Sequence, residues 1–291
     1  MAVAEANVVR LFAGLAGLEQ TLRDLSIRGD IIKTMHRVMV AAGRDADVSV
    51  FALHGEKVTD QVLGRLVERG LHDELRGSAY AVVDGVDGRT HHLQFSTLEM
   101  TGDAKLGAIV EARAYRDDRG YDRLSLAIRS DLSLQAQVAA PGATWLDRQL
   151  LSRDTTTGSG FGTDVRDAMD RRIDHLVTEG LARRQGQQTV FARDLLDTLR
   201  RREIKEVASK LSVETGLAYQ PAGEGEHVAG IYRRRVVLSS GRFAMIDDGL
   251  GFQLVPWRPA LERHANEHVA GVVLPGGRVD WSLGRKRGLS L

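Results

Sequence analysis

The chain has 291 residues, of which 43% are hydrophobic and 27% are charged. This composition is that of a soluble globular protein, and the length suffices for two or three compact units. The formal net charge of +1 excludes a uniformly basic nucleic-acid coat but leaves room for local basic patches. Because cysteine is absent, disulfides, thiolate zinc sites and a cysteine nucleophile are excluded.

Two further features bear on where the protein acts. The apolar runs are far shorter than a membrane span. The first residues lack the basic region and the long apolar core of a signal peptide. We therefore expect a cytoplasmic protein with no membrane partner.

Residues 1–76 predict a helical, winged-helix-like segment. Asp30 is a suitable N-cap for a helix that ends at Gly43, and a second helix is expected at about 60–68, before a strand. Helix, turn, helix and strand is the order of winged-helix modules, which bind DNA in some proteins and are plain scaffolds in others. The helical spacing rests on Ile31, Ile32, Met35, Val38 and Met39 in the first helix and on Val62, Leu63, Leu66 and Val67 in the second.

Residues 77–140 predict a small β-barrel or sandwich. Short apolar runs separated by turn residues are typical of such folds. A final apolar run at 132–138 is expected to be the strand that closes the barrel. The other expected strands are 79–83, 91–95, 108–114 and 124–128.

Residues 141–216 predict a second winged-helix-like segment. The glycine- and threonine-rich stretch 155–162 is interpreted as a linker between two folding units, since no Gly-Lys-Ser/Thr follows it as a phosphate loop requires. Helices are expected at 163–180 and, after an Asp194 cap, up to Gly216. Two short strands are expected between them, at 181–184 and 189–191.

Two six-residue stretches are alike, LVERGL at 66–71 and LVTEGL at 176–181. Each is expected to close a helix and to open a strand, as in a winged helix. So short a match is also consistent with coincidence.

Residues 217–291 predict a β-rich C-terminal domain. Within 241–257, Asp248-Gly249 supplies the positive φ angles of a tight hairpin turn between two apolar runs. Residues at period two make one face of this hairpin apolar, and that face must be covered: Phe243, Met245, Phe252 and Leu254. The four segments together predict an α+β fold.

Several stretches of the sequence carry a family resemblance. The most specific are GRFAMIDDGLGFQLVPW at 241–257, RPALE at 258–262 and GRVDWSLGRKRGL at 277–289. Others lie upstream, at 28–33, 77–83, 142–150, 176–187 and 191–203. Together they are similar to the C-terminal region, itself of unknown function, of conjugative relaxase/mobilization nucleases of the T-DNA border endonuclease type. The resemblance implies a role in conjugative DNA transfer and places the nuclease half before residue 1.

No catalytic residue, metal site or cofactor is predicted. Relaxases of the resembled type nick DNA with a tyrosine assisted by a metal ion on a His-x-His pair, and no two of the nine histidines are separated by one residue. On a strand, His91 and His92 point to opposite faces and cannot hold one ion together. His264 and His268 share a helix face, which we interpret as solvated. We expect no nicking by this chain alone, and its status as an enzyme stays open.

Three basic clusters are the candidate nucleic-acid-binding residues. They comprise Arg200, Arg201, Arg202 and Lys205; Arg233 and Arg235; and Arg285, Lys286 and Arg287. The first cluster also fits a solvated helix face, which Glu203 and Glu206 partly neutralise. On a strand, Arg233 and Arg235 share one face and Arg234 takes the other. The third has flanking glycines and is the best phosphate contact.

The charges of the expected helix 163–180 have a plainer interpretation. Its aspartates alternate with Arg166, Arg171 and Arg172, which predicts ion pairing within the helix.

Two functional hypotheses follow. In the first, the chain is a non-catalytic module that assists plasmid mobilization by binding DNA or by docking onto the transfer machinery. In the second, it only presents a secretion signal to a type IV coupling apparatus. The expected partners are DNA, a relaxase nuclease domain or fragment, and a type IV secretion coupling protein.

Overall fold

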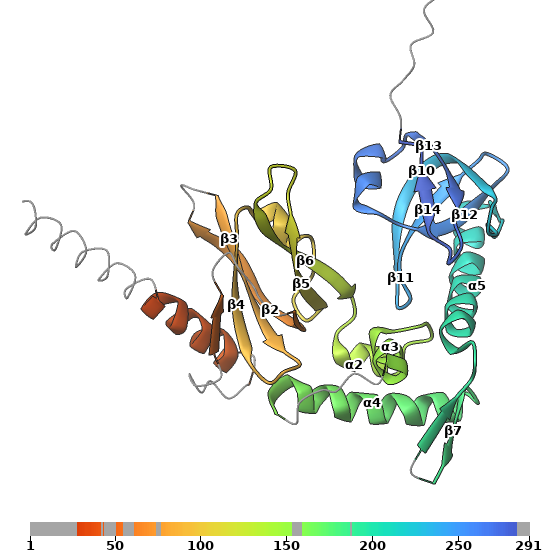
Figure 1. Ribbon diagram of the computed structural model, residues 1–291. Helices are drawn as coiled ribbons and strands as arrows, with labels where there is room; N and C mark the ends of the chain where they lie inside the picture. The colour runs from red at the N-terminus through yellow and green to blue at the C-terminus, as the bar shows by residue number, and fades with distance from the viewer. Residues whose placement is uncertain are drawn as a thin grey trace, which may run out of the picture. The chain divides into compact units, whose positions relative to one another are not determined.

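The computed structural model describes residues 28–41, 43, 51–54, 61–73, 77–152, 159–186 and 188–283, and over these it is α+β, as predicted (Figure 1). The chain divides into two compact units. The first comprises Met1–Arg129 and Thr155–Arg166, and the second comprises Ser130–Asp154 and Asp167–Leu291. The sequence predicted four segments, and its boundary after residue 76 falls between two strands that pair in one sheet.

A six-stranded sheet forms the first unit, in the order β1-β4-β3-β2-β5-β6. Strand β1 runs parallel to β4, whereas β4, β3, β2 and β5 are successively antiparallel. The expected strands 79–83, 91–95, 108–114 and 124–128 are confirmed and form the hairpins β3–β4 and β5–β6. A short 3-10 helix, η2 (Leu98–Thr101), follows β4. The strands are β1 (Phe51–His54), β2 (Val62–Asp73), β3 (Ser78–Gly85), β4 (Thr90–Phe95), β5 (Ile109–Arg116) and β6 (Asp122–Ser130).

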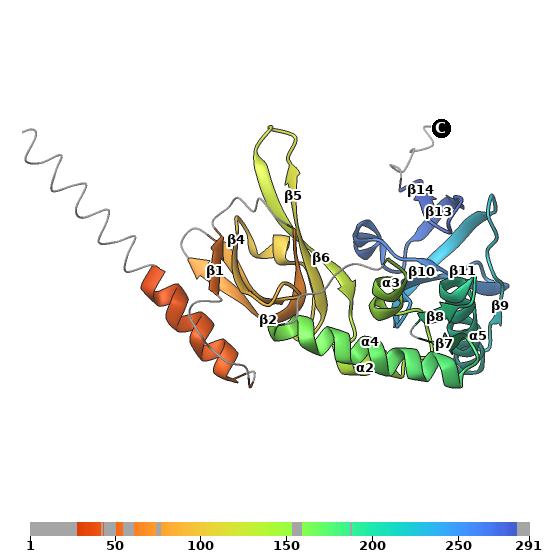
Figure 2. The same ribbon diagram turned by 60° about the horizontal axis from the view of Figure 1, so that its bottom comes forward.

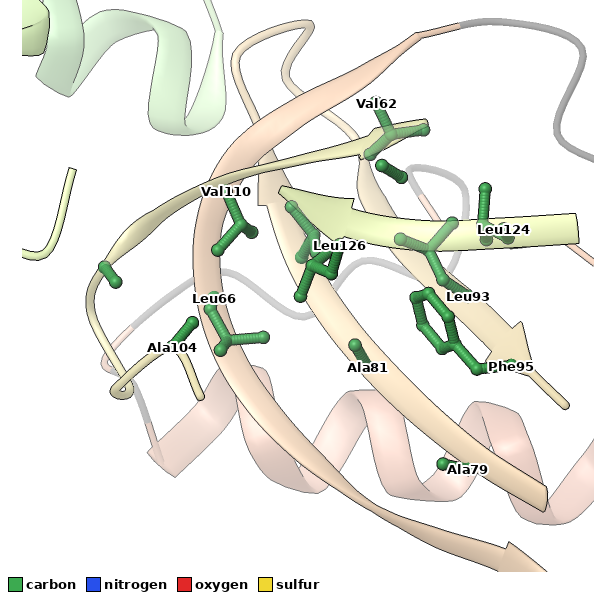
Figure 3. Packing of buried hydrophobic residues seen from close by; sticks show 13 residues of the cluster. Val62, Leu66, Ala79, Ala81, Leu93, Phe95, Ala104, Val110, Leu124 and Leu126 are labelled. Carbon is green, nitrogen blue, oxygen red and sulfur yellow. The ribbon is translucent and has the colours of Figure 1, made fainter. Parts of the chain in front are cut away.

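The sheet is curled but open. Leu124 and Leu126 of β6 lie over Leu93 and Phe95 of β4, so one face closes on a common apolar core (Figure 3). The strand order is nevertheless linear, and among the described residues β1 and β6 are not neighbours. The expected closed barrel is therefore not formed by the described strands. They form an open, curled sheet in which β4 and β6 pack on one apolar core, without hydrogen bonds between the edge strands.

The second helix expected at 60–68 is wrong, because this stretch belongs to strand β2. Val62, Gly64 and Leu66 are buried, and the residues between them are only partly covered, which is the period of a strand. Gly64 lies so close to the backbone carbonyl of Asp84 that a side chain there would collide with it. The described part of segment 1–76 therefore lacks the helix-turn-helix order of a winged helix. The likeness between 66–71, in a strand, and 176–181, at the end of a helix, is not structural.

The first predicted helix is confirmed at 28–41. Of its predicted apolar stripe, Ile31, Met35, Val38 and Met39 are buried, and Ile32 is only partly buried. Gly43 follows with a positive φ of 69°, the conformation that commonly ends a helix. Asp30 lies within the helix, where it pairs with Lys33, and is not its cap.

The second unit begins with helices packed around a polar loop. The expected strand at 132–138 is wrong: α2 (Leu134–Val138) is a helix whose N-cap, Ser133, accepts a hydrogen bond from the Ala136 amide. Helices α3 (Trp145–Ser152) and α4 (Gly160–Thr178) follow. Residues 155–158 of the expected linker 155–162 lie outside the described residues. Helix α4 begins at Gly160, inside the expected linker and before the expected Thr163.

A small hairpin and a long helix complete this helical part. Strands β7 (Ala182–Gln185) and β8 (Gln188–Phe191) and helix α5 (Leu195–Thr215) confirm the expected elements. Gly216 ends α5 in the left-handed region, at φ 73°. Helix, hairpin and helix is the order expected within 141–216, and α4, β7–β8 and α5 follow it. These elements share a core with Leu176, Leu181, Leu195 and Leu199 at its centre.

The C-terminal sheet has the order β14-β13-β10-β11-β12-β9 (Figures 1 and 2). The expected hairpin is confirmed, since β11 and β12 flank Asp248-Gly249 and Gly249 has a φ of 88°. The sequence predicted one buried face, but both are covered. Phe243, Met245, Phe252 and Leu254 pack on α5, and Ala244, Ile246 and Val255 pack on the opposite side with Leu261 of η3. The elements are β9 (Ala218–Tyr219), β10 (His227–Leu238), β11 (Gly241–Asp247), β12 (Gly251–Pro256), η3 (Pro259–His264), β13 (His268–Val273) and β14 (Val279–Trp281).

A buried guanidinium fixes the helices of the second unit. Arg172 of α4 and Asp147 of α3 have fully buried side chains, joined by Nε to Oδ1 at 2.8 Å and Nη2 to Oδ2 at 2.9 Å. Arg172 also donates to the carbonyls of Val138, Ala140 and Gly142, at 3.2, 2.7 and 3.0 Å. The predicted pairing of Arg172 within its own helix is therefore wrong. The guanidinium instead satisfies a loop whose carbonyls have left a helix.

A second buried carboxylate joins α5 to the C-terminal sheet. Glu203 accepts hydrogen bonds from the amides and hydroxyls of Ser239 and Ser240, at 2.5–3.0 Å. The Ser240 hydroxyl also accepts from the Ala143 amide at 2.9 Å. Gly142 lies against the Glu203 carboxylate, where a side chain would not fit. Glu203 thus stabilises the β10–β11 turn. The prediction that it neutralises the neighbouring arginines is wrong.

Replacing Asp147 with Asn should lower the free energy of unfolding of the second unit by about 3–5 kcal/mol, because Arg172 would stay buried without a counter-charge. Arg184→Gln is the matched control, since the Arg184–Asp174 pair is exposed and should contribute under about 1 kcal/mol. All three tryptophans lie in the second unit, so urea denaturation followed by tryptophan fluorescence reports on it selectively. Equal losses in the two variants would contradict the structural role of the buried pair.

Candidate nucleic-acid interface

The arginines of α5 face solvent at three successive positions. Arg201 is 71% exposed, against 37% for Arg200 and 54% for Arg202, and Lys205 is exposed one turn further on. The shortest side-chain ion pairs are Arg200 to Asp197 at 3.9 Å, Arg201 to Asp194 at 3.1 Å and Arg202 to Glu179 at 3.8 Å. All three carboxylates are themselves exposed, so these pairs contribute little to stability and a phosphate can replace them.

The acidic partners of this cluster differ from those predicted. Glu203 is buried, and Glu206 pairs with Lys210 at 2.6 Å. A hydrogen bond from Thr198, and more weakly the charge of Arg201, hold the pKa of Asp194 below its ordinary value. The cluster therefore stays partly neutralised, but by Asp194 and Asp197 at the start of α5 and by Glu179, which follows α4.

The arginines of β10 do not share the face that alternation predicted. A β-bulge between Tyr232 and Arg234 inserts Arg233 as an extra residue in the ladder with β11. Arg233 bonds Asp247 with Nε at 2.9 Å and Nη2 at 2.8 Å. Asp247 lies on the same face of β11 as Met245, and Ala244 lies on the other face. Arg233 bonds Asp247, whereas Arg235 is paired with Ala244, so the two arginines lie toward opposite faces.

Each of these arginines has a structural role. Hydrogen bonds from the Gly249 amide and from Arg233 hold the pKa of Asp247 below its ordinary value, although burial opposes them. Arg235 lies over the Trp257 ring at 4.8 Å and is 4.0 Å from Glu262. Both therefore have turn or packing partners that a phosphate would displace. The third cluster, Arg285, Lys286 and Arg287, lies outside the described residues.

The adjacent histidines point to opposite faces of β4, as predicted. His91 accepts or donates at both ring nitrogens, with Nδ1 2.8 Å from Nε2 of His54 and Nε2 3.0 Å from Oδ1 of Asp87. An ionised Asp87 only accepts, so a neutral His91 carries its proton on Nε2 and accepts from His54.

His92 lies on the other face, stacked on Tyr80 at 5.4 Å between ring centroids and 6.2 Å from His72. Its Nδ1 is buried without a hydrogen-bond partner. Burial, and then the nearby His72, lower the pKa of His92 to about 4. Burial and a hydrogen bond to Glu68 raise the pKa of Tyr80 to about 12. Both groups are thus held neutral at physiological pH.

The described part of the chain has neither a metal-binding cluster nor a membrane-spanning helix. No three His, Asp or Glu side chains there are grouped so that they could hold one metal ion. No helix there combines the length and the apolar character that a membrane crossing requires. The prediction that His264 and His268 lie on one helix is wrong, because η3 ends at His264 and His268 begins β13. These two histidines therefore do not share a helix face.

Comparison with known proteins assigns a family. The chain matches the family described as "Protein of unknown function (DUF3363)" over residues 1–124 and 111–290. It therefore belongs to that family. No curated protein matches the chain, and no solved structure does.

Sequence reasoning passed over exposed arginines that the structure places beside turns. Arg183 lies on the β7–β8 hairpin, and Arg113, Arg116 and Arg119 lie on the β5–β6 hairpin. The signal in the sequence is the repeated arginine around a turn, but it is visible only once the strands are known to pair.

The buried His92 should make the first unit sensitive to acid. The pKa of His92 is about 4 in the folded chain and 6.5 in the unfolded chain, so below pH 6.5 the unfolded chain takes up a proton that the folded chain does not. The free energy of unfolding is therefore highest above pH 6.5 and decreases as the pH falls toward 4. His92→Leu should remove about 2–3 kcal/mol of this pH dependence. The free energy of unfolding, measured by far-ultraviolet circular dichroism at several pH values, checks this. The exposed His36→Gln is the control, and a slope that is the same in all three proteins would contradict the prediction.

Proposed function

We propose that this chain is a non-catalytic module of a conjugative-transfer relaxase, which acts in the cytoplasm and assists plasmid DNA mobilization by binding DNA and by docking onto the transfer machinery. The resemblance of its motifs to the relaxase C-terminal region suggests the setting. The observation that carries DNA binding is the row of exposed arginines on α5, whose carboxylate partners are equally exposed. Its partners would be DNA, a relaxase nuclease domain and a type IV secretion coupling protein.

The physical basis is an exchange of ions. A surface arginine paired with a surface carboxylate gains about 0–1 kcal/mol. A phosphate backbone offers closely spaced charges and releases condensed counterions when it is neutralised. Arg200, Arg201, Arg202 and Lys205 are therefore better placed to contact phosphate than Arg233 and Arg235, which have stronger intramolecular partners.

The alternative is a module that only presents a secretion signal to the coupling apparatus. The extensive pairing of its arginines with carboxylates favours this reading, because neutralised charges attract DNA weakly. The two functions differ in how affinity for DNA depends on salt.

Replacing Arg201 and Arg202 with Gln should flatten the slope of log affinity against log salt for duplex DNA by roughly two, without changing sequence preference. The double variant Arg258→Gln, Arg263→Gln removes two other exposed arginines of the same unit and should leave the slope unchanged. Fluorescence anisotropy over a salt series measures both. Arg285→Ala with Lys286→Ala tests the terminal cluster in the same way.

Stability should change by under about 1 kcal/mol in each variant, because the pairs removed are exposed. An unchanged salt slope in Arg201→Gln, Arg202→Gln and in the terminal variant would remove the DNA-binding half of the proposal. The secretion-signal reading would then stand in its place.

A further inference from the structure

The β5–β6 hairpin projects beyond the sheet to which it belongs (Figures 1 and 2). The first half of β5, Ile109–Ala112, is buried, and its second half, Arg113–Arg116, is exposed. The tip closes with a hydrogen bond from the Asp117 amide to the Tyr121 carbonyl at 2.9 Å, and Gly120 takes a φ of 81°. The far half of the hairpin is thus a two-stranded arm whose side chains are mostly exposed.

One face of this arm combines rings and positive charge. Since 117 pairs with 121, antiparallel register pairs 115 with 123 and 113 with 125. Arg113, Tyr115, Tyr121 and Arg123 therefore share a face. Two contacts agree with this register: Arg123 lies over the Tyr121 ring at 5.6 Å and bonds Asp117 at 3.0 Å.

The two tyrosines are exposed where a folded core would not need them. Tyr121 is 62% exposed and Tyr115 is 38% exposed. The hydroxyl of Tyr115 donates to the sulfur of Met100 at 3.2 Å, which anchors this ring against η2 and leaves part of it open to solvent. Flat rings held beside guanidinium groups form a platform on which another π system can stack.

Arginines surround the platform. Arg113 is 3.0 Å from Glu111, and Arg129 contacts the same buried carboxylate, so one negative charge serves two arginines. Arg116 pairs with Asp122 at 3.2 Å, with both side chains exposed, and Arg119 is exposed at the tip. Five arginines, all at least partly exposed, thus lie here with four carboxylates, Glu111, Asp117, Asp118 and Asp122, which leaves an excess of one positive charge.

We infer that this face of the β5–β6 hairpin binds single-stranded DNA, with bases stacked on Tyr115 and Tyr121 and phosphates on the surrounding arginines. Unpaired bases are required because a duplex hides the faces of its bases, whereas a single strand offers one to each ring. The arginines supply the sequence-independent attraction to the backbone. This inference rests on the proposed function and deepens it, since it names the form of DNA and a contact in the first unit.

The test uses the full-length chain and a fluorescently labelled oligothymidylate. Tyr121→Ala should weaken binding by roughly 5- to 100-fold, as expected for the loss of one base–aromatic stack. Tyr121→Phe keeps the ring and should retain affinity within about twofold. Tyr115→Phe should also bind normally, and Tyr115→Ala with Tyr121→Ala should lose more than Tyr121→Ala alone. Because Tyr121 is well exposed, its replacement does not threaten folding, and circular dichroism verifies this.

The outcomes separate this inference from the proposed function. If Tyr121→Ala binds the oligonucleotide as tightly as the unaltered chain, the hairpin inference is wrong even if the arginines of α5 set the salt slope for duplex. If Tyr121→Ala loses single-strand affinity while Arg201→Gln, Arg202→Gln changes nothing, the inference holds and the role of α5 fails. If the unaltered chain binds neither form of DNA, both fail, and the exposed face is left as a candidate protein contact.

Discussion

The second unit depends on one buried cation. Arg172 is fully buried and presents its donors to protein partners, namely the Asp147 carboxylate and the carbonyls of Val138, Ala140 and Gly142. A guanidinium suits this position because its planar fork satisfies a carboxylate and several carbonyls at once. Removing either charge would strand the other in an environment that charges tolerate poorly. The bend between α2 and α3 and the approach of α4 are therefore fixed together.

The same polar core extends to the C-terminal sheet through Glu203. This carboxylate binds the Ser239-Ser240 turn, and Ser240 in turn accepts from the loop that Arg172 holds. A buried network in which every member is satisfied specifies one arrangement more sharply than apolar contact alone. It also explains the asymmetry of α5, whose single inward carboxylate fixes the helix while its arginines stay at the surface.

Charge is consequently distributed in two different ways. In the C-terminal sheet, Arg233 and Arg235 are engaged by a turn and by a tryptophan. On α5 and on the β5–β6 hairpin, arginines are exposed and their partners are weak or, at Glu111, buried. Charge counting along the sequence treats these positions alike. Only the pairing of strands, and the bulge after Tyr232, shows which arginines have stronger structural partners and which are exposed.

The sequence by itself determined most local elements: the Asp248-Gly249 hairpin, the β7–β8 hairpin, the apolar stripe of helix 28–41 and the end of α5 at Gly216 follow from turn chemistry and periodicity. Tertiary structure decided β2, where Val62, Leu63, Leu66 and Val67 fit a helix as well as a strand and pairing with β3 and β5 settled the choice. It also decided that both faces of the β11–β12 hairpin are buried, and that Arg172 leaves its own helix for Asp147. The physical reason is that periodicity reports which side chains avoid water, whereas the partner that covers or neutralises them comes from residues distant in the chain.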